Sequence, residues 1–359
     1  MSMFFWRIIK EMFYNSFKPG EEWRDTDNNL IQAHAGYIYQ EDGTFYWYGE
    51  NKEKSESERD CWHWGVRLYS STDLYNWKDE GIILKAETSD TTHPLYFNSK
   101  MDRPHLIYNE KTKKYVMWIK IMRGPYSSTN HACIAVADSI KGPYQIVKDN
   151  YLPNGFEFGD FEIVKDGENA YLIYEKPHTE LVISQLTEDY LAVEENYKSY
   201  FKNGRPPLIR EAPATFVKDD NLYMVTSGTT AKFPNQSEIA VSNNGYMGEW
   251  KVLGDPFVGD EKKTSFDSQV SCIFKCPNKK NLYIVMADRW LIDLPTNLPN
   301  ISEIYDEMFR IYPEEIDFRE EDWTKRNTKN ARYVWLPLVF ENGQPVIKWY
   351  DEWKLEDFE

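Results

Sequence analysis

The feature that most constrains how this chain folds is a hairpin pattern that recurs five times. Each copy has a short apolar run, a polar turn, and a second apolar run with Tyr or Phe near its start. The copies lie at residues 36–50, 105–121, 161–176, 213–228 and 271–290. Two such runs joined by a short polar turn are typical of a β-hairpin. The sequence therefore predicts an all-β protein assembled from five related hairpins.

Most copies are followed by a second, more amphipathic pair of runs, as at residues 66–84 and 133–147. Four strands in each unit, with units roughly 50–70 residues apart, match the radial repeats of a β-propeller. Residues 332–353 supply closing strands. A β-sandwich accounts less well for a fivefold recurrence, and no linker or shift in composition marks a second domain. We therefore expect residues 1–359 to form a single five-bladed β-propeller domain.

One segment interrupts the pattern. Between residues 291 and 330, apolar side chains recur at positions 301, 304, 305, 308, 309 and 312. This spacing is helical. We expect a helical insertion packed on the rim of the propeller. The same insertion could cover the site or join two subunits, and its pattern does not choose between these roles.

The charge of the chain restricts its partners. The formal net charge is −16 at pH 7, whereas nucleic acids and anionic membranes are bound by basic patches. We therefore expect neither nucleic acid nor a membrane as a partner. Aromatic residues make up 16% of the chain, which fits both aromatic-rich strands and a site that stacks against flat, hydroxylated ligands.

The cysteines and the N-terminus indicate the compartment. The four cysteines are Cys61, Cys133, Cys272 and Cys276. So few in so long a chain do not make a disulfide framework, and the last two lack the second His or Cys pair of a zinc site. The apolar N-terminus is interrupted by Arg7, Lys10 and Glu11, unlike a signal peptide. No stretch is long enough to span a membrane, so we expect a cytoplasmic protein.

Polar residues recur where the first strand of each unit begins. In a propeller these strands line the central channel, and ligands bind at its mouth. The candidates are His34 and Glu50 in the first unit, Asp102 and Arg103 in the second, Asp160 in the third, Glu211 in the fourth, and Asp267 and Gln269 in the fifth. Any one of them could be an ordinary turn residue. Their recurrence at one edge of successive blades predicts a shared site.

Glu211 is the strongest candidate for a general acid. Glycoside cleavage needs a protonated carboxylic acid beside the leaving oxygen, and burial or a neighbouring carboxylate can keep a carboxyl group protonated. Glu211 is followed by Ala212 and Pro213, and proline restricts the residue before it to extended backbone. Asp160 lies one blade away and could tune and orient Glu211.

Seven motifs, in this order, resemble those of glycoside hydrolase family 43, and more narrowly its exo-β-1,3-galactanase branch. They are HAGYIYQEDGTFYWYGE, DRPHLIYNEKTKKYVMW, FGDFEIVKDGENAYLIYE, REAPATF, SGTTAKFPN, SQVSCIF and ARYVWLPL. The resemblance runs from about residue 30 to the C-terminus, apart from the insertion. It implies a five-bladed propeller that hydrolyses glycosides with inversion.

The resemblance also implies roles for single residues. Most family members use an Asp base on the first blade, and this chain has Ala-His-Ala-Gly there. The galactanase branch shares that gap and places a Gln on the fifth blade, proposed to act on water in an imidic-acid form. By this match Glu211 is the acid, Asp160 its modulator, and Gln269 the residue in the base position. Glu50, Asp102 and Thr229 fall at positions that hold the terminal sugar. From the residues alone, His34 reads as a structural channel residue, and Arg103 as the bidentate partner of a carboxylate.

Three departures from the branch bear on the site. Asp102 stands where the branch usually has Glu, and Asp267 where it tends to have Gly. Ala231-Lys232 replaces a Gly-Trp pair, which removes an aromatic platform unless Phe233 or the loop 62–64 substitutes. Because side chains two apart on a strand project to one side, Asp267 could assist Gln269 as a base. The alternative is a solvated rim aspartate.

The leading interpretation is an exo-acting, inverting hydrolase that releases terminal galactose from β-1,3-linked galactan or oligosaccharides. An α-L-arabinofuranosidase or β-xylosidase of the same family is the second interpretation, against which the missing first-blade Asp counts. A carbohydrate-binding propeller without turnover is the third. Some family members hold a calcium ion in the channel, but no ligand cluster in this sequence indicates one. We expect no cofactor, and the sequence does not indicate an oligomeric state.

Overall fold

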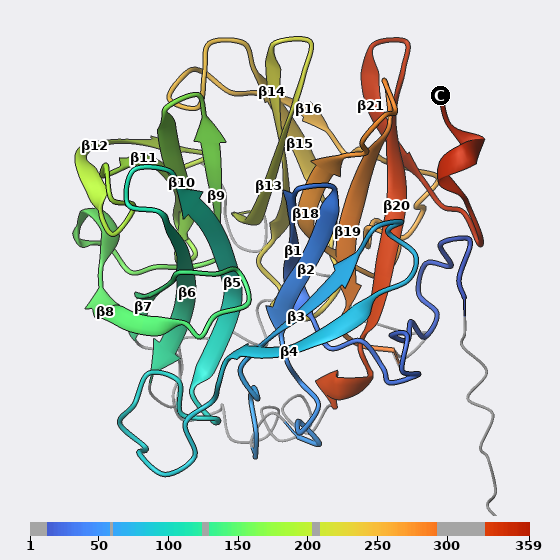
Figure 1. Ribbon diagram of the computed structural model, residues 1–359. Coiled ribbons are helices and arrows are strands. Elements are labelled where there is room, and N and C mark those ends of the chain that lie inside the picture. Colours follow the sequence, from blue (N-terminus) through green and yellow to red (C-terminus); the bar gives the residue numbers. More distant parts are fainter. Residues whose placement is uncertain (1–12, 58–59, 124–128, 203–208, 293–326) are drawn as a thin grey trace, which may run out of the picture.

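The computed structural model describes residues 13–57, 60–123, 129–202, 209–292 and 327–359, and within them five β-sheets surround a common axis (Figure 1). Blade one is β1 (His34–Glu41), β2 (Thr44–Glu50), β3 (Val66–Ser71) and β4 (Lys78–Leu84). Blade two is β5 (Lys100–Asn109), β6 (Lys114–Arg123), β7 (Thr129–Ala137) and β8 (Gln145–Tyr151). Blade three is β9 (Phe161–Asp166), β10 (Asn169–Lys176), β11 (Glu180–Leu186) and β12 (Val193–Tyr200).

Blade four is β13 (Arg210–Lys218), β14 (Asn221–Gly228), β15 (Glu238–Ser242) and β16 (Lys251–Gly254). Blade five is β18 (Gln269–Lys275), β19 (Tyr283–Arg289), β20 (Arg332–Glu341) and β21 (Gln344–Lys348), with the short β17 (Phe257–Val258) parallel to β21. The described residues also form three 3₁₀ turns: η1 (Pro153–Gly155), η3 (Thr328–Asn330) and η4 (Leu355–Asp357). The predicted five-bladed propeller is confirmed, and each of the five predicted hairpins forms the first two strands of one blade.

The hairpin turns form where the sequence predicts them, because their residues accept positive φ. Asp42-Gly43 has φ values of 48° and 77°, and Asn342-Gly343 has 51° and 77°. Two consecutive positive φ values define the turn whose twist matches that of antiparallel strands. Asp219-Asp220 adopts the same geometry, with φ values of 48° and 61°.

The innermost strands β1, β5, β9, β13 and β18 contact one another in a closed ring. The ends of the chain reinforce the seam between blades one and five. Phe17 forms an isolated bridge with Trp353 and stacks on its ring at 4.3 Å. Trp47 of β2 and Trp335 of β20 pack in the same cluster, with ring centres 4.8 Å apart. Much of the aromatic content therefore lies in the core.

The expected helical insertion lies outside the described residues, apart from residues 291–292 and 327–330. Among the residues that are described, no helix is long and apolar enough to cross a membrane.

Candidate active site

A shared backbone bulge places three of the predicted site residues at equivalent points of their blades. The pairing register shifts directly after His34 in β1, Asp102 in β5 and Glu211 in β13. In each case the next residue is left-handed without being glycine, with φ of 44° at Ala35, 49° at Arg103 and 50° at Ala212. The extended backbone expected at Ala212, before Pro213, is therefore not found. Such a conformation costs about 1 kcal/mol or more at each position. Strained bulges of this kind re-aim side chains beside active sites.

Glu211 and Asp160 lie together at this edge of the channel with opposite tendencies to ionise. Burial, followed by the charges of Asp160 and Glu175, raises the pKa of Glu211 well above its usual value. Burial also favours the neutral form of Asp160, but Arg103 and Lys120 more than offset it and lower its pKa to about 2. The distances agree, since Arg103 Nε is 2.7 Å and Lys120 Nζ 2.8 Å from the Asp160 carboxylate. The pair therefore holds a proton on Glu211 and a negative charge on Asp160.

Gln269 links the two carboxyl groups through Arg103. Its Nε2 donates to Glu211 Oε1 at 3.0 Å and to Ser227 Oγ at 3.0 Å. Its Oε1 accepts from Arg103 Nη2 at 3.0 Å and from Trp290 Nε1 at 3.4 Å. Guanidinium and indole nitrogens only donate, so they fix the amide with its oxygen toward Arg103 and its nitrogen toward Glu211.

This network corrects one expectation. Arg103 does not form a bidentate pair with one carboxylate. From the bulge of β5 in blade two, its Nε binds Asp160, beside blade three, and its Nη2 binds Gln269 of blade five. Its Nη1 is buried and has no hydrogen-bond partner among the described residues.

Glu50 and Asp102 lie beside the same network. Glu50 accepts from the Arg103 backbone N–H at 2.9 Å and pairs with Lys52 Nζ at 2.9 Å. Burial raises the pKa of Glu50, and Lys52 opposes the shift. Asp102 accepts from Trp62 Nε1 at 2.9 Å and lies 3.9 Å from Lys120 Nζ. The predicted sugar-binding carboxylates are thus held close to Asp160 and to the network that reaches Glu211.

The departure at Lys232 changes the wall of this site. Phe233 cannot replace the missing platform, because it is buried against Ala35 and Trp290. Trp62 is half-buried, and Lys232 Nζ lies 4.4 Å from its ring centre and 5.0 Å from that of Trp290. Thr229, just after β14, is buried with its Oγ1 unpartnered among the described residues.

His34 is fully buried and has a structural partner. Its Nδ1 lies 3.2 Å from Asp288 Oδ1, and its ring stacks on Tyr333 at 5.0 Å. Burial lowers the pKa of His34, which favours the neutral ring. Asp288 also accepts from the Ala35 N–H at 3.0 Å, so it fixes the bulge of β1. These contacts are consistent with the expectation that His34 is a structural residue of the channel.

Asp267 and Gln269 do not share one side of a strand. β18 begins at Gln269, and Ser265, Phe266 and Asp267 all have left-handed backbone, with φ of 54°, 54° and 57°. Strand alternation applies only to extended residues. The charge of Asp267 acts on Arg289, and its role as a base stays a prediction without that support.

Sequence reasoning missed several residues of the network: Lys52, Lys120, Ser227, Asp288 and Trp290. Lys120, Ser227 and Asp288 lie opposite Asp102, Glu211 and Gln269 in the pairing register. A signal was present, because each is a polar residue near the end of the second strand of its hairpin. Lys120 in particular interrupts the apolar run of β6.

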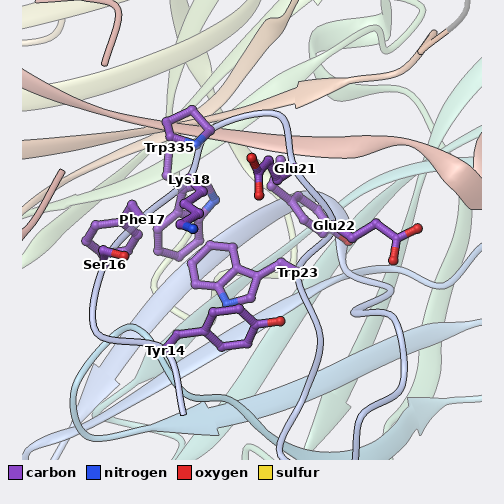
Figure 2. Close-up of a pocket in the computed structure, with 10 residues that line it drawn as sticks. Tyr14, Ser16, Phe17, Lys18, Glu21, Glu22, Trp23 and Trp335 are labelled. Atoms are coloured by element: carbon purple, nitrogen blue, oxygen red, sulfur yellow. The ribbon is translucent and has the colours of Figure 1, made fainter. Parts of the chain in front are cut away.

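A pocket in Figure 2 is lined by residues 14–23 of the N-terminal segment together with Tyr333 and Trp335 of β20. None of the predicted site residues lines it. Among the described residues, no group of three or more His, Cys, Asp or Glu side chains could hold a metal ion, and none of the four cysteines forms a disulfide.

Comparison with known proteins decides the family. The sequence profile of "Glycosyl hydrolases family 43" matches residues 32–288. The chain belongs to glycosyl hydrolase family 43. This confirms the resemblance seen in the motifs and makes the chain an O-glycosyl hydrolase with a carbohydrate substrate. No curated protein matches the sequence significantly.

Solved structures of family 43 include close matches in fold. The β-1,3-galactosidase BT0265 has a TM-score of 0.78 and 31% identity, and the match covers 96% of this chain and 65% of BT0265. The β-1,3-galactosidase BT3683, solved with galactodeoxynojirimycin, has a TM-score of 0.75 and 30% identity over 94% of this chain and 100% of BT3683. An exo-β-1,3-galactanase from Phanerochaete chrysosporium, solved with β-1,3-galactotriose, has a TM-score of 0.75 and 25% identity over 95% of this chain and 68% of its own.

Proposed function

We propose that this family 43 hydrolase is an exo-acting, inverting β-1,3-galactosidase, with Glu211 as its general acid. The observation that carries the proposal is the opposite ionisation of two buried carboxyl groups. The pKa of Glu211 is raised and that of Asp160 is lowered. When the surroundings move the pKa values of two neighbouring carboxyl groups apart, the group with the raised pKa is the one suited to act as the acid. The β-1,3-galactosidases among the similar structures support the choice of sugar and linkage.

In this mechanism Glu211 gives its proton to the glycosidic oxygen as the bond to the anomeric carbon breaks. The proton is favoured because burial, and then the negative charge of Asp160 that Arg103 and Lys120 hold in place, oppose the ionisation of Glu211. Once the proton has left, the same two cations stabilise the new carboxylate. Asp160 therefore acts through Glu211 as a positioning residue.

Inversion requires a water on the opposite face of the sugar, and the two groups of an inverting pair usually stand roughly 6.5–9.5 Å apart. The resemblance places Gln269 in the base position. Its Nε2 is 3.0 Å from Glu211 Oε1, well inside that spacing, so in this arrangement the amide holds the acid in place. An unperturbed amide is a poor base, and the proposal therefore assigns most of the catalysis to the acid and to positioning.

The terminal galactose would lie against Glu50, Asp102 and Thr229. Carboxylates accept hydrogen bonds from sugar hydroxyl groups, and the half-buried ring of Trp62 offers an apolar face. The buried Nη1 of Arg103 and Oγ1 of Thr229 lack partners among the described residues, so a hydroxyl group or a water would satisfy them.

The test is product release from a panel of nitrophenyl glycosides and β-1,3-galactobiose, with Glu211→Gln as the control variant. We expect galactose from galactobiose, first seen as the α-anomer by proton NMR. Release of arabinose or xylose alone would assign the second family activity. No release from any substrate by the folded wild-type protein would favour a binding propeller.

A further inference from the structure

The turn that precedes Gln269 has an unusual backbone. Ser265, Phe266 and Asp267 are left-handed one after another, with φ of 54°, 54° and 57°. A side chain makes this conformation costly, so such residues persist only where the surrounding structure imposes it, and they cluster at functional sites. β18 begins with Gln269, two residues after Asp267. The turn therefore sets the position at which Gln269 enters the candidate site.

Hydrogen bonds on several sides impose the left-handed turn. Asp260 Oδ2 accepts from the N–H groups of Thr264 and Phe266 at 2.7 and 3.2 Å. Thr264 Oγ1 accepts from the Asp267 N–H at 3.1 Å. Arg289 Nη2 donates to the Phe266 carbonyl at 2.8 Å. The backbone of the turn is thus fixed by bonds both within the turn and from β19.

Ser265 ties the turn to blade four. Its Oγ donates to the Asn235 carbonyl at 2.8 Å and accepts from the Ser237 N–H at 3.0 Å. The Asn235 side chain accepts from the Gly228 N–H at 2.7 Å, and it donates to the Gly228 carbonyl at 2.8 Å and to Thr230 Oγ1 at 2.7 Å. Ser265, Asn235 and Ser237 are all buried. A buried polar cluster therefore joins the turn to the end of β14.

The end of β14 carries two residues of the candidate site. Ser227 lies 3.0 Å from the Gln269 amide nitrogen, and Thr229 is predicted to hold the terminal sugar. Both are neighbours of Gly228, whose two backbone groups are bound by Asn235. The same cluster thus fixes one side of the site on blade four and, through the turn, Gln269 on blade five.

We propose that Ser265 is a positioning residue, which acts through the left-handed turn to hold Gln269 against Glu211, and that Asp267 serves this turn through its backbone. The proposal rests on the proposed function, because it takes Gln269 and Glu211 to belong to the catalytic network. Asp accepts left-handed backbone better than most residues, and Gly accepts it best. The turn is held rigid so that the amide of Gln269 meets the acid without reorganisation.

Asp267→Gly and Asp267→Val test the backbone role, because both variants lack the carboxylate and differ in their tolerance of positive φ. We expect kcat/KM on β-1,3-galactobiose to be higher in Asp267→Gly than in Asp267→Val by about tenfold, since a small displacement of a catalytic group has effects of this order. Equal values in the two variants would show that the carboxylate matters and the backbone does not, which overturns the proposal.

Ser265→Ala tests the anchor itself. Ser242→Ala is the matched control, because Ser242 is as buried as Ser265 and its Oγ also donates to a carbonyl, that of Gly245 at 2.9 Å. Denaturant unfolding should show similar losses of stability in the two variants. Only Ser265→Ala should lower kcat on galactobiose, by about tenfold or more, with a smaller change in KM. Equal kcat values in the two variants would contradict a positioning role.

Crystal structures of the two serine variants separate this proposal from the proposed function, because they need no substrate. In Ser265→Ala we expect residues 265–267 to leave the left-handed conformation and the hydrogen bond from Gln269 to Glu211 to be lost. In Ser242→Ala both should be kept. This result would support the role of Ser265 even if no galactoside were cleaved, an outcome that would sink the proposed function alone. A turn and a Gln269 side chain that stay in place in Ser265→Ala overturn the proposal.

Discussion

Gln269 donates a hydrogen bond from Nε2 to Oε1 of Glu211 at 3.0 Å. Arg103 and Trp290 donate to the amide oxygen, so the amide nitrogen faces Glu211 and Ser227. A donor of this kind favours the charged form of a carboxyl group. Gln269 therefore limits how far the surroundings raise the pKa of Glu211, in opposition to burial and Asp160.

Replacing Gln269 by Leu should move the alkaline limb of the pH profile of kcat/KM upward. Removing a hydrogen bond to a carboxylate raises its pKa by about one unit, and Glu211 must be protonated to act. The profile is measured on β-1,3-galactobiose. Ser227→Ala is the control, because it removes the other partner of the same amide nitrogen and keeps the bond from Gln269 to Glu211. An unchanged limb in Gln269→Leu would show that the bond does not tune the acid.

Replacing Asp160 by Asn should move the same limb in the opposite direction. Asp160 is the charge that most raises the pKa of Glu211 after burial, and a neutral amide removes that repulsion. We expect a downward shift of about one pH unit together with a fall in kcat. A shift to higher pH would mean that Asp160 does not act on Glu211 through its charge.

The blades could be predicted from the sequence because each hairpin is specified by residues that lie close together in the chain. Turn residues such as Asp42-Gly43 and the apolar runs around them specify each hairpin, and five hairpins in succession indicate a propeller. The candidate for the acid could be chosen in the same way, since Glu211 follows the same strand-opening pattern as Asp102. The roles assigned to these residues remain predictions that the kinetic tests address.

The partners of the acid were less accessible, because they depend on register across strands. Lys120 and Asp288 become site residues only when β6 and β19 pair with the inner strands of their blades. Backbone conformation matters in the same way. Alternation suggested that Asp267 shares a side with Gln269, but a left-handed turn before β18 removes that relationship.

Glu162 should make stability fall as the pH rises. It is fully buried on β9, where its carboxyl group accepts from the Thr215 N–H at 2.8 Å, and burial raises its pKa from 4.5 to about 8. The folded state therefore binds more protons than the unfolded state in this range. Stability is fully present below pH 4.5 and falls by up to about 1.4 kcal/mol per pH unit as the pH rises toward 8.

Denaturant unfolding of Glu162→Gln at pH 5 and pH 8 measures this effect. The variant should lose less stability between the two values than the wild-type protein. Glu249→Gln, at an exposed position, should follow the wild-type protein. Equal losses of stability between pH 5 and pH 8 in Glu162→Gln and in the wild-type protein would contradict a buried, neutral carboxyl group at Glu162.

Phe17→Ala should destabilise the closure of the propeller. Phe17 is 2% exposed and stacks on Trp353 and Trp335 across the seam between blades one and five. Truncation of a buried Phe costs about 3–5 kcal/mol, which denaturant titration resolves. Phe13→Ala is the matched control, because Phe13 is 75% exposed. Equal stabilities for the two variants would show that the N-terminal segment does not hold the ring closed.

The central claim, that Glu211 is the general acid, is tested most directly by the leaving group. Hydrolysis of β-1,3-galactobiose needs protonation of a poor leaving group. The dinitrophenolate of 2,4-dinitrophenyl β-galactoside, in contrast, leaves almost without protonation. We predict that Glu211→Gln lowers kcat on galactobiose by about 10²–10⁴-fold, the usual size of general-acid catalysis, and lowers kcat on the dinitrophenyl substrate by less than about tenfold. Equal losses on the two substrates, in a variant that still binds galactose, would contradict the assignment.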